Sequence, residues 1–235
     1  MSETSPGNLI LSMQNPDLYD HPVDGFQVIE THISQVILTG DFAYKIKKPM
    51  DFGFLNFSTL DRRKHFCEEE LRLNRRLAEK LYLEVVPITG TPDAPILGGE
   101  GEAFEYAIKM RQFGQDQLFD RLQEHGQLPS DLLTDLARQV AGFHEQLPPV
   151  PDDKPLGTPE AVFAAMQENF EQIRPLIDDP DLLMQLDNLQ AWTESTFERH
   201  RELIAHRRAN GMVRECHGDL HLANITRFDG EVTVF

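Results

Sequence analysis

The chain has 235 residues, with 22 Lys and Arg against 39 Asp and Glu, which gives a formal net charge of −17. This length suits one large domain or two small lobes, and a hydrophobic content of 40% excludes wholesale disorder. Such an acidic surface repels phosphate backbones, so we exclude a sequence-independent nucleic-acid binder and expect any site for an anionic ligand to be a local basic pocket or a metal site. The two cysteines, Cys67 and Cys216, form neither a disulfide framework nor a zinc ribbon and fit a reducing compartment.

The N-terminal sequence has neither the basic stretch nor the long apolar run of a signal peptide. No apolar run approaches the roughly 20 residues that cross a bilayer. We therefore expect a cytoplasmic protein whose partners include neither a membrane nor a nucleic acid.

The first 110 or so residues predict a mixed sheet with one long helix. Ser58 or Thr59 can cap that helix, with the acidic Asp61 in its first turn. The predicted elements are a short helix over 8–19, two or three antiparallel strands over 26–47, the long helix to about Leu81, and a strand pair at 85–88 and 103–110, joined by a link at 91–101.

The remainder of the chain predicts helices, followed by a hairpin whose turn is Asp229-Gly230. Within the helical part we expect Trp192 and Phe197 to lie in the core. The change in pattern near Gln112 divides the chain into two predicted parts, a sheet-and-helix lobe over 1–112 and a helical lobe over 113–235. The helical segments are 117–125, 130–147 with a stripe at Leu133, Leu136, Ala137, Val140 and Phe143, 159–177 and 181–209.

The most informative string is Cys216-His217-Gly218-Asp219-Leu220-His221-Leu222-Ala223-Asn224-Ile225. It lies between a helical region and the hairpin, so it predicts a loop that holds Asp219 and Asn224 five residues apart. Phosphoryl transfer from ATP uses such a pair, because a carboxylate orients the attacking hydroxyl and accepts its proton while an amide oxygen binds Mg²⁺.

This string resembles the H-G-D-x-x-x-x-N loop of the aminoglycoside phosphotransferase family, whose fold is protein-kinase-like. The resemblance implies an α+β fold of two lobes, an N-lobe with an antiparallel sheet and a helix, and a mainly helical C-lobe that is incomplete here. It implies transfer of phosphate from ATP, with Mg²⁺, to a hydroxyl of a small molecule. In the catalytic loop 216–225, Asp219 is then the catalytic base, Asn224 a metal ligand, and His217 a support of the loop.

A kinase-like fold also requires a lysine on its third strand, and Phe42-Ala43-Tyr44-Lys45 stands where V-A-I-K stands in protein kinases. Strand alternation puts Ala43 and Lys45 on one face, where the small alanine admits adenine and the lysine reaches the phosphates. Lys47 shares this face, so it remains an alternative to Lys45.

The next helix is expected to supply a glutamate that pairs with this lysine, and it offers three at 68–70. Glu70 shares a helical stripe with Phe66 and Leu73, so it is the one expected to turn inward. Glu69 is the second choice.

The segments 32–34, 45–49 and 61–71 are similar to one bacterial branch in which such a module precedes a P-loop ATP-binding module. The similarity covers essentially the whole chain. It implies a C-terminal P-loop domain as a partner in a longer protein, but it does not identify the acceptor substrate.

Three departures from the kinase pattern bear on activity. A glycine-rich nucleotide loop is absent at 32–40, and Asp51-Phe52-Gly53 stands too early to be the metal-binding tripeptide, so we expect it to form a plain loop. The second metal-binding Asp is expected directly after the strand that ends at Phe235. We therefore expect a fragment of a longer enzyme that is inactive alone, and the alternative is a catalytically dead kinase-like binding or scaffold module.

Two other site types are rejected from the sequence. A zinc set would need Cys67 to join Cys216, His217 and His221, which is an arbitrary combination with two adjacent members. A two-metal phosphoesterase would need more histidine ligands after His221, and the sequence contains none there.

Overall fold

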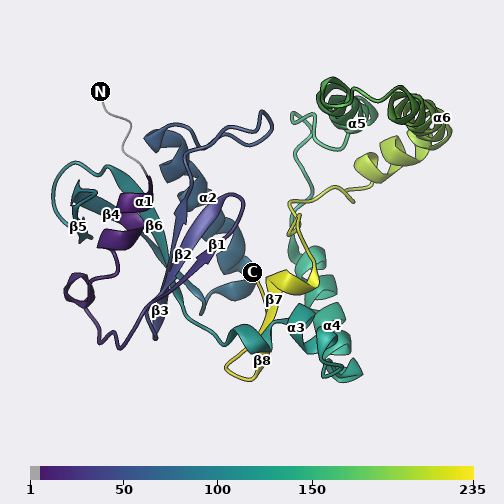
Figure 1. The fold of residues 1–235 in the computed structure, drawn as a ribbon. Coiled ribbons are helices and arrows are strands. Elements are labelled where there is room, and N and C mark those ends of the chain that lie inside the picture. The colour runs from purple at the N-terminus through teal and green to yellow at the C-terminus, as the bar shows by residue number, and fades with distance from the viewer. Residues whose placement is uncertain (1–5) are drawn as a thin grey trace. The chain divides into compact units, whose positions relative to one another are not determined.

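The computed structural model describes residues 6–235, which divide into two compact units (Figure 1). One unit joins the residues up to Leu136 with 219–235, and the other comprises 137–218. The division falls within helix α4 (Ser130–Gln146), and each unit is described by itself. The lobe boundary near Gln112 stays a prediction.

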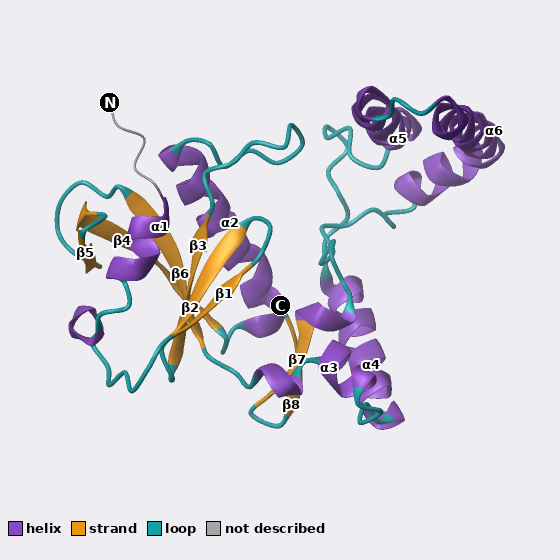
Figure 2. Cartoon of the chain, in the orientation of Figure 1, coloured by secondary structure: helices purple, strands orange, loops and turns teal. Residues whose placement is uncertain are grey.

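A six-stranded antiparallel sheet forms the centre of the first unit, in the order β1-β2-β3-β6-β4-β5 (Figure 2). It confirms the antiparallel strands expected over 26–47 and the expected pairing of the two later strands. The strands are β1 (Gln27–Glu30), β2 (Ser34–Leu38), β3 (Phe42–Lys47), β4 (Tyr82–Thr91), β5 (Ala94–Leu97) and β6 (Glu105–Arg111).

Strand β5 was not predicted, because the segment 91–101 was taken as a plain link. Its Pro95 pairs with Gly90 of β4 at the edge of the sheet. Proline is tolerated on an edge strand, where its missing N–H breaks no further ladder. The Pro and Gly content of this segment therefore marks a tight hairpin rather than an absence of strands.

Helices cover both faces of the sheet. Helix α1 (Pro6–Ser12) packs on one face through Leu9 and Ile10, in a cluster with Tyr44 and Ile46 of β3. Helix α2 (Leu60–Ala78) packs on the opposite face, where the buried cluster contains Leu38, Ala43, Cys67, Ala78, Leu81, Tyr82, Ile108 and Met110.

Thr59 caps α2, because its Oγ1 accepts a hydrogen bond of 3.3 Å from the backbone N–H of Arg62. The hydroxyl of Ser58 instead donates to Asn56 Oδ1 at 2.6 Å. Of the two predicted candidates, Thr59 is therefore the N-cap of α2. Asp51-Phe52-Gly53 lies in the loop before α2, as expected, and Asp51 Oδ1 accepts from the backbone of Gly53.

The part of the chain that follows the sheet is helical, as predicted. Together with the antiparallel sheet, these helices confirm the predicted α+β class. The helices are α3 (Phe119–Glu124), α4, α5 (Pro159–Ile173) and α6 (Pro180–Ala209), with short 3₁₀ turns at 16–18, 115–117, 174–176 and 222–224. No helix in the described part of the chain is long and apolar enough to span a membrane.

One predicted core residue of the second unit is wrong. Phe197 is 3% exposed and stacks on Phe163 at 4.6 Å, as expected of a core residue. Trp192 is 61% exposed. Helical periodicity fixes the spacing of apolar residues but not which of them a neighbouring element covers, and the 30 residues of α6 bury only Leu186 and Phe197 fully.

The chain returns to the first unit as the predicted hairpin of β7 (Ile225–Phe228) and β8 (Glu231–Val234). Asp229 and Gly230 have φ values of 50° and 83°, the left-handed pair that a two-residue hairpin turn requires. Ile225 and Val234 are buried in a cluster with Phe119 and Leu122 of α3.

Candidate functional site

Strand β3 directs Lys45 toward helix α2. Pleating puts Ala43 and Lys45 on the α2 side of the sheet, while Tyr44 joins the cluster on the other side. The ammonium Nζ of Lys45 donates to Glu70 Oε1 at 2.7 Å. The structure therefore brings together the lysine and the glutamate that the sequence paired.

Lys47 contacts the same carboxylate. Its Nζ donates to Glu70 Oε2 at 2.5 Å, so one glutamate is shared by two lysines. The side chain of Lys47 is 4% exposed and that of Lys45 is 26% exposed. Glu69 points elsewhere and pairs with Arg72 at 2.8 Å, so it is not the partner of either lysine.

The electrostatics of this group follow from burial and from its two positive charges. Burial alone would raise the pKa of Glu70, but the ammonium groups of Lys45 and Lys47 outweigh it and lower the pKa to about 2. Burial acts to lower the pKa of Lys45, yet the Glu70 carboxylate reverses this and raises it. Lys45 and Glu70 are thus held in their charged forms.

Two neutral groups complete the surroundings of this charge cluster. Burial raises the pKa of the Cys67 thiol on α2 to about 12, and it raises the pKa of Tyr82 on β4 to about 12. Ala43 lies in the same buried cluster and is 6% exposed. The residue predicted to admit adenine therefore lines the same face of the sheet as Lys45.

The loop before the hairpin brings Asp219 and Asn224 into contact. Asn224 Nδ2 donates to Asp219 Oδ2 at 3.1 Å and to the backbone oxygen of Asp219 at 2.9 Å. The Asp219 side chain is 77% exposed, so it is open to a substrate. Both bonds use the amide nitrogen, which leaves the Oδ1 of Asn224 as the atom that could bind a cation.

One histidine lies beside this pair, and another precedes it in the sequence. His221 Nε2 lies 3.6 Å from Asp219 Oδ2, within ion-pair range if the imidazole is protonated. His217 is partly buried and belongs to the second unit. Its predicted role as a support of the loop stays a prediction.

The β7–β8 hairpin links the loop to the face of the sheet that carries Lys45. The backbone N–H of Phe235 donates to the backbone oxygen of Asn224 at 2.9 Å. The ring of Phe235 lies 5.1 Å from that of Phe113 and packs on the same cluster as Ala43. The Asp219–Asn224 pair and the Lys45–Glu70 pair are therefore parts of one compact unit.

A second buried ion pair on α2 was missed from the sequence. Arg63 Nε donates to both carboxylate oxygens of Glu105 at 2.9 Å, and Arg63 Nη1 donates to the backbone oxygen of Phe57 at 3.1 Å. Arg63 precedes Cys67 by four residues and Glu70 by seven, so the stripe that selected Glu70 also indicated Arg63. This pair ties the start of α2 to the start of β6.

The described residues, 6–235, contain no group of three or more His, Cys, Asp or Glu side chains suited to a metal ion. The oxygens of Asp219 and Asn224 are nevertheless of the type that Mg²⁺ takes, since that ion retains water and phosphate ligands and needs few from protein.

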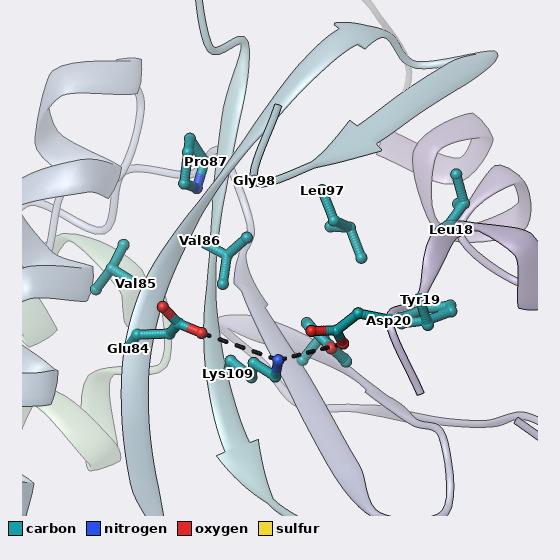
Figure 3. Close-up of a pocket in the computed structure, with 11 residues that line it drawn as sticks. Leu18, Tyr19, Asp20, Glu84, Val85, Val86, Pro87, Leu97, Gly98 and Lys109 are labelled. Carbon is teal, nitrogen blue, oxygen red and sulfur yellow. Dashed lines mark hydrogen bonds and ion pairs between the residues drawn. The ribbon is translucent and has the colours of Figure 1, made fainter. Parts of the chain in front are cut away.

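A cavity of about 360 Å³ lies on the other face of the sheet (Figure 3). Tyr44, Lys109 and Glu84 form a cross-strand row there, and Lys109 Nζ lies 3.5 Å from Asp20 and 3.9 Å from Glu84. Because Tyr44 and Lys45 are consecutive strand residues, they point to opposite faces. This cavity is therefore separate from the lysine–glutamate cluster.

Comparison with known proteins gives two findings. The family model described as the phosphotransferase enzyme family matches residues 54–235. The uncharacterised proteins Mb2027c of Mycobacterium bovis and Rv2004c of Mycobacterium tuberculosis are each 29% identical to this chain over 218 residues. That match covers 90% of this chain and 41% of each relative, so the chain spans about two fifths of their length. No solved structure matches.

Proposed function

Because the chain belongs to the phosphotransferase enzyme family, whose kinase-like two-lobe fold the sequence predicted, we propose that it serves ATP-dependent transfer of phosphate to a hydroxyl of a small molecule. The observation that carries this proposal is the contact between Asp219 and Asn224, in the same compact unit as the Lys45–Glu70 pair. An anion-binding cluster and a carboxylate–amide pair are the two parts that phosphoryl transfer needs.

Asp219 acts on the acceptor. Its exposed carboxylate accepts a hydrogen bond from the acceptor hydroxyl and takes its proton as the hydroxyl oxygen bonds to the γ-phosphorus. The bond between this phosphorus and the bridging oxygen breaks, and ADP leaves with the electron pair. Asn224 holds Asp219 through its amide nitrogen and offers Oδ1 to Mg²⁺, which would neutralise phosphate charge.

Lys45 acts on the nucleotide. Between the two candidate lysines, Lys45 is the more exposed, so its ammonium is the one that reaches the α- and β-phosphates while Glu70 braces it. Ala43, on the same face of β3, leaves room for adenine. His217 supports the catalytic loop.

For the acceptor we propose only a chemical class, and the cellular setting and the partner domain follow from sequence patterns. An acidic chain attracts a cationic acceptor, as an aminoglycoside would be. The sequence patterns favour a cytoplasmic bacterial protein in which a P-loop domain follows this module.

The second candidate function is a catalytically dead binding or scaffold module. It is favoured by the positions of the two acidic residues of the hairpin, the candidates for a second metal ligand. Asp229 lies in the turn, and Glu231 Oε2 is paired with Lys80 Nζ at 3.0 Å. Neither is placed to be a second metal ligand beside Asn224, so we expect little or no turnover by this chain alone. Turnover by the whole protein separates the two functions.

The test is phosphoryl transfer by the whole protein with Mg²⁺ and ATP. We expect Asp219→Asn to lower kcat by roughly 10²- to 10⁴-fold, the usual contribution of a positioned base. Asp229→Asn is the matched control, because it removes a nearby exposed carboxylate that has no role in the site. Unchanged kcat in Asp219→Asn would refute the mechanism, and a wild-type protein that binds ATP without turnover would favour the scaffold.

A further inference from the structure

One carboxylate on α2 is shared by two lysines of the same strand. Lys45 and Lys47 are two residues apart on β3, so they point to the same face. Each takes a different oxygen of Glu70, at 2.7 Å for Oε1 and 2.5 Å for Oε2. The Glu70 side chain is 16% exposed, which makes it a largely buried charge with both oxygens paired.

The two lysines differ in what surrounds them. Lys47 is 4% exposed, its Nζ lies 4.9 Å from the centre of the Phe57 ring, and its strand partner Ser34 is fully buried. Lys45 is 26% exposed. Lys47 is thus enclosed by protein to a greater degree than Lys45, so Lys45 is the more accessible of the two to a phosphate.

A change of partner by Lys45 has a consequence for Glu70. When the Lys45 ammonium turns its donors to a phosphate, it gives up part or all of its bond to Glu70 Oε1. A buried carboxylate that loses its counter-charge is strongly destabilised, and it responds by taking up a proton or by moving to solvent. With Lys47 in place, Glu70 keeps a charged partner throughout.

We propose that Lys47 is a positioning residue that keeps Glu70 ionised and turned inward while Lys45 binds nucleotide phosphates. This inference rests on the proposed function for the role of Lys45, but not for the hold of Lys47 on Glu70. It makes the inward position of α2 independent of bound nucleotide. Lys47 then acts through Glu70 and touches no substrate.

The decisive experiment needs no nucleotide. Lys45→Met in the 235-residue chain imitates the state in which Lys45 has left Glu70, because methionine keeps an unbranched side chain of four heavy atoms and lacks only the terminal ammonium group. The pKa of Glu70 is read from the pH titration of its side-chain carboxyl ¹³C signal by NMR. The other groups that face Glu70 are Cys67 on α2 and Tyr82 on β4, and both stay neutral through this titration.

We expect the pKa of Glu70 to stay below the usual glutamate value in Lys45→Met and to rise above it when Lys47→Met is added. Should Lys45→Met alone raise it as far as the double variant does, the inference is wrong. If the double variant does not fold, the pair Lys45→Met and Lys45→Met with Lys47→Gln gives the same comparison with a polar residue at position 47.

A second measurement tests the consequence for binding. The probes are Mg-ATP and adenosine, and the dissociation constant of adenosine divided by that of Mg-ATP isolates the contribution of the phosphates. We expect Lys47→Met to lower that ratio about tenfold, the scale of one charge-assisted hydrogen bond, because Lys45 is then the sole partner of Glu70. Adding Glu70→Gln removes the competing charge and should restore the ratio, whereas an unchanged ratio in Lys47→Met would overturn the inference.

The two measurements separate this inference from the proposed function. A wild-type protein that binds neither probe refutes the proposed role of Lys45, while the titration of Glu70 still decides whether Lys47 holds that carboxylate. Lys45→Met is the control for the second measurement, since it should lose the phosphate contribution whichever residue stands at position 47.

Discussion

At the scale of single residues, Glu70 shows how a helical stripe selects one side chain among similar neighbours. Three consecutive glutamates precede Leu71, and only the one in register with Phe66 and Leu73 reaches the sheet. Glu69, one residue earlier, pairs with Arg72 at the surface. The spacing of apolar residues was therefore sufficient to predict the orientation of Glu70.

The depth of a side chain on a strand is harder to predict. Alternation places Lys45 and Lys47 on one face and gives no measure of which is covered, because that depends on the loop that carries Phe57 and on the packing of α2. The sharing of Glu70 between two lysines could not be predicted for the same reason. The Arg63–Glu105 pair joins segments 42 residues apart, and the stripe indicates only its first member.

The ionisation of Glu70 makes a prediction about acid stability. Its pKa is about 2 in the folded chain against a usual value of 4.5, so the unfolded chain binds the proton more tightly. The stabilisation is therefore complete above about pH 4.5 and is lost as the pH falls toward 2. It is on the order of 3 kcal/mol, from about 1.4 kcal/mol for each pKa unit.

We expect Glu70→Gln to lower the free energy of unfolding by that order of magnitude at pH 7, and the difference from wild type to shrink as the pH falls below 4. Chemical denaturation at a series of pH values measures this. Glu69→Gln on the exposed face of the same helix is the matched control, with an expected change below about 0.5 kcal/mol. A Glu70→Gln difference that is constant from pH 7 to pH 3 would contradict the assignment.

At the scale of elements, the predictions hold where neighbouring residues in the sequence determine the structure. They are wrong where the structure depends on which distant segment packs against the element. The hairpin turn at Asp229-Gly230 was predicted from two residues, because few other pairs adopt its left-handed backbone. Strand β5 was missed, since its Pro95 reads as a strand breaker until its edge position is known. Trp192 was misplaced, since its exposure depends on what packs against α6.

The start of α2 gives a prediction at this scale, because two adjacent hydroxyl residues were candidates for its cap. Thr59 Oγ1 accepts the N–H of Arg62 at 3.3 Å, so Thr59→Ala should lower the free energy of unfolding by about 1 kcal/mol. Thr59→Ser keeps the acceptor and should recover most of this loss. Thermal or urea unfolding measures both, and a greater loss in Ser58→Ala than in Thr59→Ala would show that the cap is misassigned.

At the scale of the whole molecule, chain order and compact units do not coincide. Residues 219–235 leave the second unit and complete the first, where Ile225 and Val234 are buried against α3. Helical periodicity and the change of pattern near Gln112 predict elements and their order, but they cannot show that a C-terminal hairpin packs with the N-terminal sheet. Contacts between distant segments carry that information.

The two cysteines report separately on the two units, which allows a test of this division. Cys67 is fully buried in the first unit, and Cys216 is partly buried in the second. Because burial raises the pKa of the Cys67 thiol to about 12 and shields it from solvent, a thiol reagent should modify it only when the first unit opens. Its rate of modification in native buffer therefore measures the opening of that unit.

Val234→Ala removes two methyl groups from a fully buried position in the hairpin and should cost the first unit about 1–3 kcal/mol. We expect modification of Cys67 to accelerate about 5- to 150-fold, in proportion to the open population, while the rate at Cys216 stays the same. Phe197→Leu, in the core of the second unit, is the matched control and should accelerate Cys216 alone. Equal acceleration of the modification of both cysteines in either variant would show that the two units open together. An unchanged rate of Cys67 modification in Val234→Ala would show that the hairpin is no part of the first unit.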